Sequence, residues 1–80
     1  MSKFLKFYTP NCSTCKALDR FIEENFPELE IQHIDATRLE SQPYVELYSI
    51  HAVPTMLRLD DSEILIGFQV DKAREFLKGN

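Results

Sequence analysis

Apolar and polar positions follow two different spacings in the first third of the chain. The aromatic-rich run KFLKFY at residues 3–8 ends at the turn-forming Thr9-Pro10-Asn11, which is typical of a strand that enters a loop. From Cys12 onward the apolar residues recur at helical intervals, at Cys15, Leu18, Phe21, Ile22 and Phe26. Charged residues fill the positions between them, so this segment is predicted to be an amphipathic helix that ends at Pro27.

The middle of the chain predicts a second strand and a second helix. Residues 30–35 (EIQHID) are bounded like a strand. The helix that follows, ending at about Ser49, has two candidate starts: a capping box at residues 37–40 (TRLE), or Ser41 ahead of Pro43. Tyr44, Val45 and Tyr48 recur at helical spacing and are predicted to be core residues.

The last third predicts a hairpin and a final helix. Residues 55–59 (TMLRL) and 63–68 (EILIGF) flank the turn-type cluster DDS, which indicates an antiparallel pair of strands. Asp71 is the predicted N-cap of a helix that carries an apolar face and has Gly79 near its end. The predicted order is strand, helix, strand, helix, strand, strand, helix, so we expect an α/β fold with a four-stranded mixed sheet flanked by three helices.

Length and charge narrow the classes of function. With 80 residues, 44% of them hydrophobic, residues 1–80 are expected to form a single domain and to be monomeric. The net charge of -4 and the scattered basic residues argue against nucleic acid as a partner. No segment has the length and apolarity of a membrane span or of a secretory leader, so we expect a cytoplasmic protein that binds no membrane.

The candidate chemistry lies at Cys12 and Cys15, three positions apart at the start of the first helix. Residues three apart share a helix face, so the two sulfurs can form and break a disulfide with little movement of the backbone. Cys12 is expected at the helix N-terminus, where free N–H groups and the helix dipole favour a thiolate. The pattern therefore predicts Cys12 as the attacking sulfur and Cys15 as the shielded sulfur that resolves a mixed disulfide.

Three alternatives for the two cysteines stay open at this point. A zinc site needs two more ligands, and His33 and His51 are too far apart for the usual spacing, so no metal is expected. Burial as inert residues would suit Cys15 better than Cys12, which follows an exposed turn. A chance C-x-x-C in a protein of another function, such as a peptide-binding module, is the third alternative.

With these residues in view, the sequence resembles the thioredoxin superfamily over residues 3–77. The segment FYTPNCSTCK is similar to the family's strand, loop and helix with the C-x-x-C, and Val53-Pro54-Thr55 is similar to its second mark, a proline after a cis peptide bond. The resemblance implies the thioredoxin-like fold and a substrate-binding role for Val53, Pro54 and Thr55 beside the cysteines. Tyr8 and Asn11 flank the site and are included as candidate substrate-binding residues.

Two departures from the family leave the subfamily open. Ser13-Thr14 matches neither the Gly-Pro of thioredoxins nor the Pro-Tyr of glutaredoxins. Lys6 stands where thioredoxins carry a buried acid that relays protons to the inner cysteine. Lys6 either lies near the cysteines, where its ammonium would lower a thiol pKa, or extends to solvent or away from them.

The interpretation is a thiol-disulfide oxidoreductase that donates electrons to disulfides of partner proteins through Cys12 and Cys15. The resemblance implies a flavin-dependent thioredoxin reductase or glutathione as the electron source, and no cofactor on the chain itself. A glutathione-dependent glutaredoxin, for which Asp71 would bind the glutathione amino group, is the nearest alternative. A small redoxin that serves ribonucleotide reductase is the other, since YTPxC and GFxxD are similar to that group.

Overall fold

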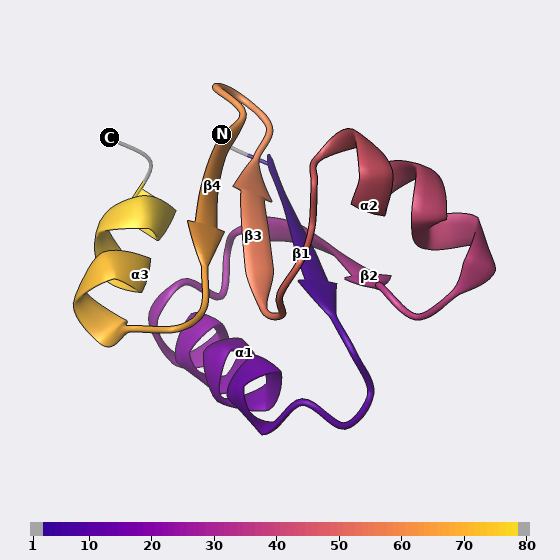
Figure 1. The fold of residues 1–80 in the computed structure, drawn as a ribbon. Coiled ribbons are helices and arrows are strands. Elements are labelled where there is room, and N and C mark those ends of the chain that lie inside the picture. Colours follow the sequence, from indigo (N-terminus) through magenta and orange to yellow (C-terminus); the bar gives the residue numbers. More distant parts are fainter. Residues whose placement is uncertain (1–2, 79–80) are drawn as a thin grey trace.

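Four strands form one mixed sheet with helices on both faces in the computed structural model, which describes residues 3–78 (Figure 1). The elements are β1 (Lys3–Tyr8), α1 (Ser13–Asn25), β2 (Glu30–Asp35), the 3-10 turn η1 (Leu39–Ser41), α2 (Gln42–Leu47), β3 (Thr55–Arg58), β4 (Glu63–Ile66) and α3 (Val70–Lys78). The predicted element order and the α/β class are confirmed.

The strand order β2-β1-β3-β4 places β1 inside the sheet. It runs parallel to β2, as a right-handed strand-helix-strand unit requires, and antiparallel to β3. Lys6 therefore lies opposite His33 on one side and Met56 on the other. The hairpin partner β4 pairs antiparallel with β3 and forms one edge of the sheet.

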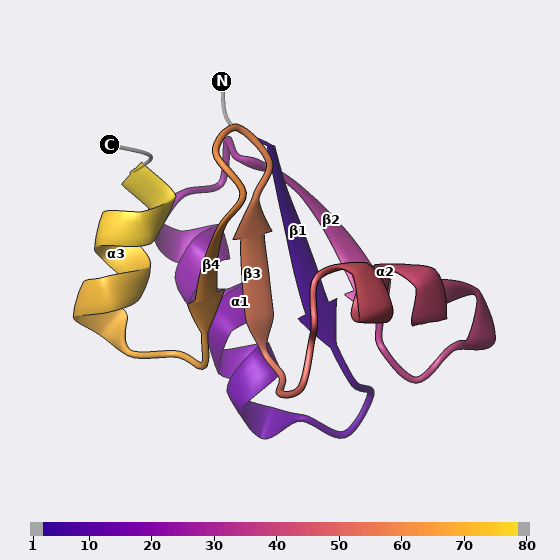
Figure 2. The same ribbon diagram turned by 45° about the horizontal axis from the view of Figure 1, so that its top comes forward.

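The alternation of side chains along β1 divides the core into two clusters. Phe4 packs with residues of α1 and α3, whereas Leu5 and Phe7 belong to a separate cluster against which Val45 of α2 packs. Figure 2 shows the helices on the two sides of the sheet. The buried residues of the first cluster are Phe4, Leu18, Phe21, Ile22, Met56, Ala73 and Leu77. Those of the second are Leu5, Phe7, Ile34, Ile50 and Leu57. Because α1 packs on one of these clusters, its N-terminus is held close to the ends of β1 and β3.

The sequence offers two candidate starts for the second helix, and the structure shows which one is used. Helix α2 begins just after Ser41 with Pro43 in its first turn, so the second alternative is confirmed. The capping box is not formed, because the backbone N–H and the hydroxyl of Thr37 both donate to Asp35 Oδ1, at 2.9 and 2.6 Å. Thr37 is thereby tied to the end of β2 and does not cap a helix.

Two smaller predictions were wrong. Tyr44 is 45% exposed, because it lies on the outer side of the short helix α2, whereas Val45 and Tyr48 do pack on the second cluster. Helix α3 begins at Val70, so Asp71 lies inside its first turn and is not the N-cap. The predicted position of Gly79 lies outside the described residues. Among residues 3–78 no helix is long and apolar enough to cross a membrane.

Candidate active site

The turn between β1 and α1 places Cys12 at the start of the helix. Cys12 has an extended backbone and is the N-cap of α1, with its N–H donating to the Thr9 carbonyl oxygen at 3.3 Å. Its own carbonyl accepts the first helical hydrogen bond, from Lys16 at 3.2 Å. The N–H of Cys15 donates to Cys12 Sγ at 3.0 Å, so sulfur takes the place of the oxygen that caps most helices. The predicted position of Cys12 is confirmed.

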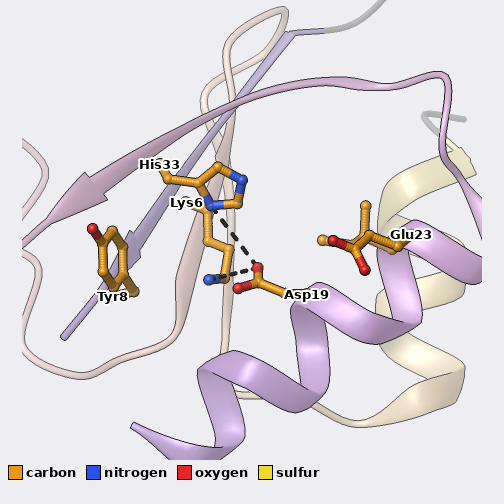
Figure 3. Close-up of a pocket in the computed structure, with 6 residues that line it drawn as sticks. Lys6, Tyr8, Asp19, Glu23 and His33 are labelled. Atoms are coloured by element: carbon orange, nitrogen blue, oxygen red, sulfur yellow. Dashed lines mark ion pairs between the residues drawn. The ribbon is translucent and has the colours of Figure 1, made fainter. Parts of the chain in front are cut away.

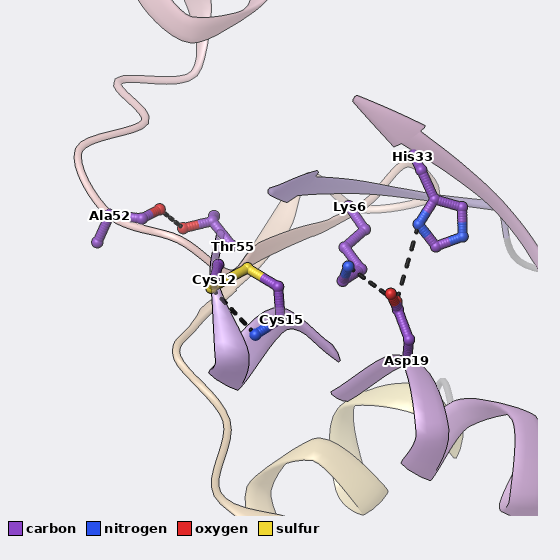
Figure 4. Close-up of a disulfide and its surroundings, with 7 residues drawn as sticks. All are labelled: Lys6, Cys12, Cys15, Asp19, His33, Ala52 and Thr55. Carbon is purple, nitrogen blue, oxygen red and sulfur yellow. Dashed lines mark hydrogen bonds and ion pairs between the residues drawn. A yellow bond between two sulfur atoms is a disulfide. The ribbon is translucent and has the colours of Figure 1, made fainter. Parts of the chain in front are cut away.

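Cys12 and Cys15 are joined by a disulfide (Figure 4). Their Cα atoms are 5.2 Å apart, inside the usual range for a disulfide, so the helical turn itself supplies the required spacing. Cys12 is partly exposed, whereas Cys15 is 2% exposed on the inner face of α1. The pair thus combines one residue that is partly open to solvent with one that is buried.

The Val53-Pro54 peptide bond is cis, and Pro54 is buried. The Pro54 carbonyl accepts a hydrogen bond from the N–H of Gly67 at 2.8 Å, and the Thr55 hydroxyl donates to the Ala52 carbonyl at 2.6 Å. Gly67 has φ +82, a backbone conformation that favours glycine, where the chain leaves β4. These contacts fix the segment that carries Val53, and Figure 4 draws Ala52 and Thr55 beside the disulfide.

The other two predicted site residues lie on either side of this turn. Asn11 is exposed directly before Cys12, and Tyr8 is half-buried at the end of β1. The Tyr8 ring faces the Lys6 ammonium, with Nζ 5.2 Å from the ring centroid. Tyr8 therefore belongs to the surroundings of Lys6 as well as to the loop that carries the cysteines.

Lys6 does not extend to solvent. It is 1% exposed on the face of β1 that packs against α1, and its Nζ lies 2.8 Å from Asp19 Oδ1. The interpretation that its side chain reaches solvent is therefore wrong. A buried ammonium without a counter-ion would destabilise the folded state by several kcal/mol. The ion pair with Asp19 offsets this cost.

Asp19 is the residue that sequence reasoning missed. The helical spacing predicts an exposed position for Asp19, between the apolar residues of α1, yet its side chain is only 38% exposed and turns toward the sheet. His33 of β2 also approaches it, with Nδ1 3.9 Å from the same oxygen. A signal was present in the sequence: a lysine inside an apolar strand needs an acid, and Asp19 is one helical turn after Cys15 on the same face.

These side chains surround a pocket of about 370 Å³ on the α1 side of the sheet (Figure 3). Its polar lining comes from three elements: Lys6 and Tyr8 of β1, Asp19 and Glu23 of α1, and His33 of β2. Across the described part of the chain, no three His, Cys, Asp or Glu side chains come together in the way that a metal ion requires. The pocket is a polar opening beside the buried ion pair.

The family model described as Thioredoxin matches residues 2–78. The chain belongs to the thioredoxin family. A family match over nearly the whole chain, together with the disulfide between Cys12 and Cys15, makes the protein a thiol-disulfide oxidoreductase of the dithiol type. The family implies disulfide substrates and reductase partners in general.

Solved structures show the same fold at low sequence identity. Thioredoxin from Fasciola hepatica is 22% identical, with a TM-score of 0.75, 96% of this chain covered and 78% of the other. Thioredoxin O2 from Arabidopsis thaliana, in its oxidised state, is 13% identical, with a TM-score of 0.74 and coverages of 98% and 73%. The thioredoxin-like protein BC3987, in a mutant form, is 22% identical at a TM-score of 0.74, with coverages of 92% and 97%. No curated protein matches the chain by sequence.

Proposed function

We propose that Cys12 attacks a disulfide of a partner protein and that Cys15 then releases the reduced partner. The supporting observation is the asymmetry of the pair: residue Cys12 is partly exposed at the N-cap of α1 and its Sγ accepts the Cys15 N–H, whereas Cys15 is 2% exposed. No acidic side chain lies in the first turn of α1. Helix N–H groups and the helix dipole should therefore hold the pKa of the reduced Cys12 thiol below its usual range.

The electron balance of this reaction closes with the two cysteines alone. The Cys12 thiolate forms a bond to one partner sulfur, and the other partner sulfur leaves as a thiolate. The Cys15 thiolate then attacks Cys12 Sγ, which breaks the mixed disulfide and frees the second partner thiol. Two electrons pass to the partner, and the chain is left with the Cys12–Cys15 disulfide that the structure contains.

The segment before β3 is the proposed site for an extended substrate segment. Proline has no N–H, so the backbone groups of Val53 are the ones available to pair with a substrate strand. Val53 is half-buried and Asn11 is exposed, whereas Thr55 is 2% exposed and its hydroxyl is already bonded to Ala52. We therefore assign substrate contact to Val53 and Asn11, and a supporting role to Pro54 and Thr55.

The proposed electron source is a flavin-dependent thioredoxin reductase, with a monomeric chain acting in the cytoplasm. The family match is to Thioredoxin over residues 2–78, which favours this source over glutathione. Glutathione remains the alternative, because the chain spans only 73–78% of the two thioredoxins compared above. Ribonucleotide reductase is a candidate among the disulfide substrates.

Reduction of insulin disulfides tests the assignment of the two sulfurs. The wild type should accelerate precipitation of reduced insulin chains, and Cys12→Ser should bring the rate down to that of the chemical reductant alone. In a separate incubation of reduced protein with insulin and no chemical reductant, Cys15→Ser should instead accumulate a mixed disulfide with the substrate, visible by mass spectrometry, because the chain has no second cysteine to resolve it. Equal activity of wild type and Cys12→Ser would contradict the assignment and leave a peptide-binding module as the function.

Coupled turnover separates the two electron sources. With NADPH, thioredoxin reductase should support repeated cycles of insulin reduction, whereas glutathione with glutathione reductase should not. The reverse result would assign the chain to the glutathione-dependent branch. Both assays use the same protein and substrate, so only the electron source differs between them.

A further inference from the structure

Strand β4 is an outer strand of the sheet, and one side of its main chain has no strand partner within residues 3–78 (Figure 1). Its other side pairs antiparallel with β3, so that Ile64 lies opposite Leu57 and Ile66 opposite Thr55. The main-chain groups of a strand in an antiparallel pair point alternately toward the partner strand and away from it. This alternation decides which N–H and C=O groups of β4 are left for another chain.

A hydrogen bond just after β4 fixes the alternation. The N–H of Gly67 donates to the Pro54 carbonyl oxygen at 2.8 Å, so the main chain of Gly67 points toward β3. By alternation Leu65 also points toward β3, whereas the N–H and C=O groups of Ile64 and Ile66 point outward from the sheet. The same hydrogen bond joins the C-terminal end of β4 to the cis proline. This outer edge therefore ends close to the candidate active site.

The side chains of the two outward-pointing residues are apolar and open to solvent. Leu65 packs on the first cluster, with α1 and α3, so alternation puts Ile64 and Ile66 on the other face of the sheet. Ile64 is 41% exposed and Ile66 is 68% exposed. Soluble proteins commonly protect an edge strand with lysine or proline, and β4 contains neither; its one charged residue is Glu63, at the first position. Aliphatic side chains of an added strand would find apolar neighbours on this face.

On the opposite face, the edge borders a pocket of about 450 Å³ between the β3–β4 hairpin and α3. Leu65 and Phe76 supply apolar lining, and α3 adds the charged residues Asp71, Lys72 and Glu75. Asp71 and Glu75 are four residues apart, so they lie on the same side of the helix. A long basic side chain fits such a lining, because its methylene stem can cover apolar surface while its charge meets a carboxylate.

The charges around the edge also favour a basic occupant. The acidic residues that flank it outnumber the basic ones, with Asp60, Asp61, Glu63, Asp71 and Glu75 against Arg58, Lys72 and Lys78. The Arg58 guanidinium already donates to Asp61 and to the Phe76 carbonyl, and Lys78 Nζ lies 3.9 Å from Glu75 Oε2. A second copy of this chain would bring the same excess of acid to the edge, and like charges across an interface are unfavourable. These charges favour a basic segment of another protein.

We propose that β4 binds an extended segment of a partner protein, in which aliphatic and basic residues alternate, as an additional antiparallel strand. The outward N–H and C=O groups of Ile64 and Ile66 supply the main-chain hydrogen bonds. The aliphatic side chains lie beside these two residues, and the basic ones enter the pocket toward Asp71 and Glu75. Because the edge ends beside the cis proline, the bound segment holds the partner next to the disulfide. The site uses neither cysteine, so it goes beyond the proposed function.

The first test compares two short capped peptides, Val-Lys-Val-Lys-Val and Val-Glu-Val-Glu-Val, by fluorescence anisotropy with the oxidised wild type. The lysine peptide should bind about tenfold more tightly, because only its charges complement the edge. Asp71→Asn combined with Glu75→Gln should weaken its binding about fivefold. Glu24→Gln combined with Glu28→Gln removes the same charge from exposed positions elsewhere and should leave the affinity unchanged. Equal binding of the two peptides would overturn the inference.

N-methylated peptides test strand pairing without any change to the protein. In an antiparallel arrangement the valines opposite Ile64 and Ile66 turn their N–H groups toward β4, and the lysine N–H groups point to solvent. Methyl groups on the valine nitrogens should therefore abolish binding, whereas methyl groups on the lysine nitrogens should leave the affinity unchanged. A valine-methylated peptide that binds as tightly as the parent peptide would rule out an added strand.

Amide hydrogen exchange shows where the peptide binds. In the free protein the amides of Ile64 and Ile66 should exchange quickly and that of Leu65 slowly, because only Leu65 points toward β3. At a peptide concentration about ten times the dissociation constant, the two isoleucine amides should exchange about tenfold more slowly. Unchanged rates would overturn the inference. Protection without peptide that grows with protein concentration would show that a second copy covers the edge, and would overturn it as well.

The variant Cys12→Ser, Cys15→Ser separates this inference from the proposed function. It should bind the lysine peptide as the wild type does, because no cysteine takes part in the strand pairing. Peptide binding by a wild type that fails to reduce insulin would contradict the proposed function alone. Insulin reduction by a wild type that does not bind the peptide would contradict the docking site alone.

Discussion

At the scale of single residues, burial alone does not separate the positions that hold the fold from those that carry chemistry. Leu18 is fully buried in the cluster between the sheet and α1, one turn after the cysteines. Lys6 is buried too, yet its head group is charged and paired with Asp19. An apolar side chain at position 18 fixes the helix against the sheet, and that packing in turn sets where Cys12 and Asp19 lie.

Truncating Leu18 should therefore weaken the whole molecule. Leu18→Ala removes a side chain with no solvent exposure, and we expect the free energy of unfolding to fall by about 2–5 kcal/mol in urea titrations. Leu47→Ala is the matched control, because Leu47 is 70% exposed on α2 and its loss should stay within about 0.5 kcal/mol. Equal effects of the two changes would contradict the packing described for α1.

At the scale of elements, the sequence was informative where turn residues or proline mark the ends of a segment. The strands at residues 3–8 and 30–35 match the structure to the residue, because each is bounded by turn residues or proline. The start of helix α2 was harder to predict, because Thr37 can donate hydrogen bonds to Asp35 instead of capping a helix. Local propensity does not decide such a competition.

Only those parts of the candidate site that lie close together in the sequence could be predicted from it. Cys12 and Cys15 are close in sequence, so their geometry follows from the helix that carries them. The Lys6–Asp19 pair joins a strand to a helix, and its formation depends on which face of β1 turns toward α1. That orientation is set by the alternation of the whole strand against two separate clusters, which no single motif contains.

The β3–β4 hairpin offers a test of electrostatics at this scale. Arg58 donates hydrogen bonds to Asp61 and, at 2.7 Å, to the Phe76 carbonyl, so it links the hairpin turn to α3. The hydrogen bond from Arg58 holds the pKa of Asp61 below its ordinary value of 3.8. A lowered pKa means that the stabilisation is present above pH 3.8 and is lost as the pH falls below that value.

Asp61→Asn should therefore lower stability at neutral pH and flatten the acid side of the stability curve. The measurement is the urea midpoint across a series of pH values from neutral to acid. Glu28→Gln, which removes a carboxylate from the loop between α1 and β2, should keep the acid dependence of the wild type. An Asp61→Asn curve parallel to that of the wild type at every pH would show that the Arg58 contact does not contribute.

At the scale of the whole molecule, the chain keeps both layers of helices in 80 residues. It spans 73–78% of the two thioredoxins compared above but 97% of the thioredoxin-like protein BC3987. The cysteines, the cis proline and the ion pair all lie on elements that this short chain retains. The candidate active site is therefore carried by β1, α1 and the segment before β3.

Both redox forms must stay folded for such a site to cycle, and the architecture predicts that they do. The two apolar clusters pack the sheet from both faces without either cysteine. The disulfide closes a loop of very few residues, so reducing it should cost about 2 kcal/mol at most by the loss of a chain constraint. Urea titrations should thus give one cooperative transition for the oxidised protein and one for the reduced protein, with similar slopes and a modest shift of midpoint.

The control is Cys15→Ser, which cannot form the disulfide, so its midpoint should not respond to the reductant. A reduced protein that unfolds without cooperativity would mean that the disulfide, and not the two clusters, holds α1 on the sheet.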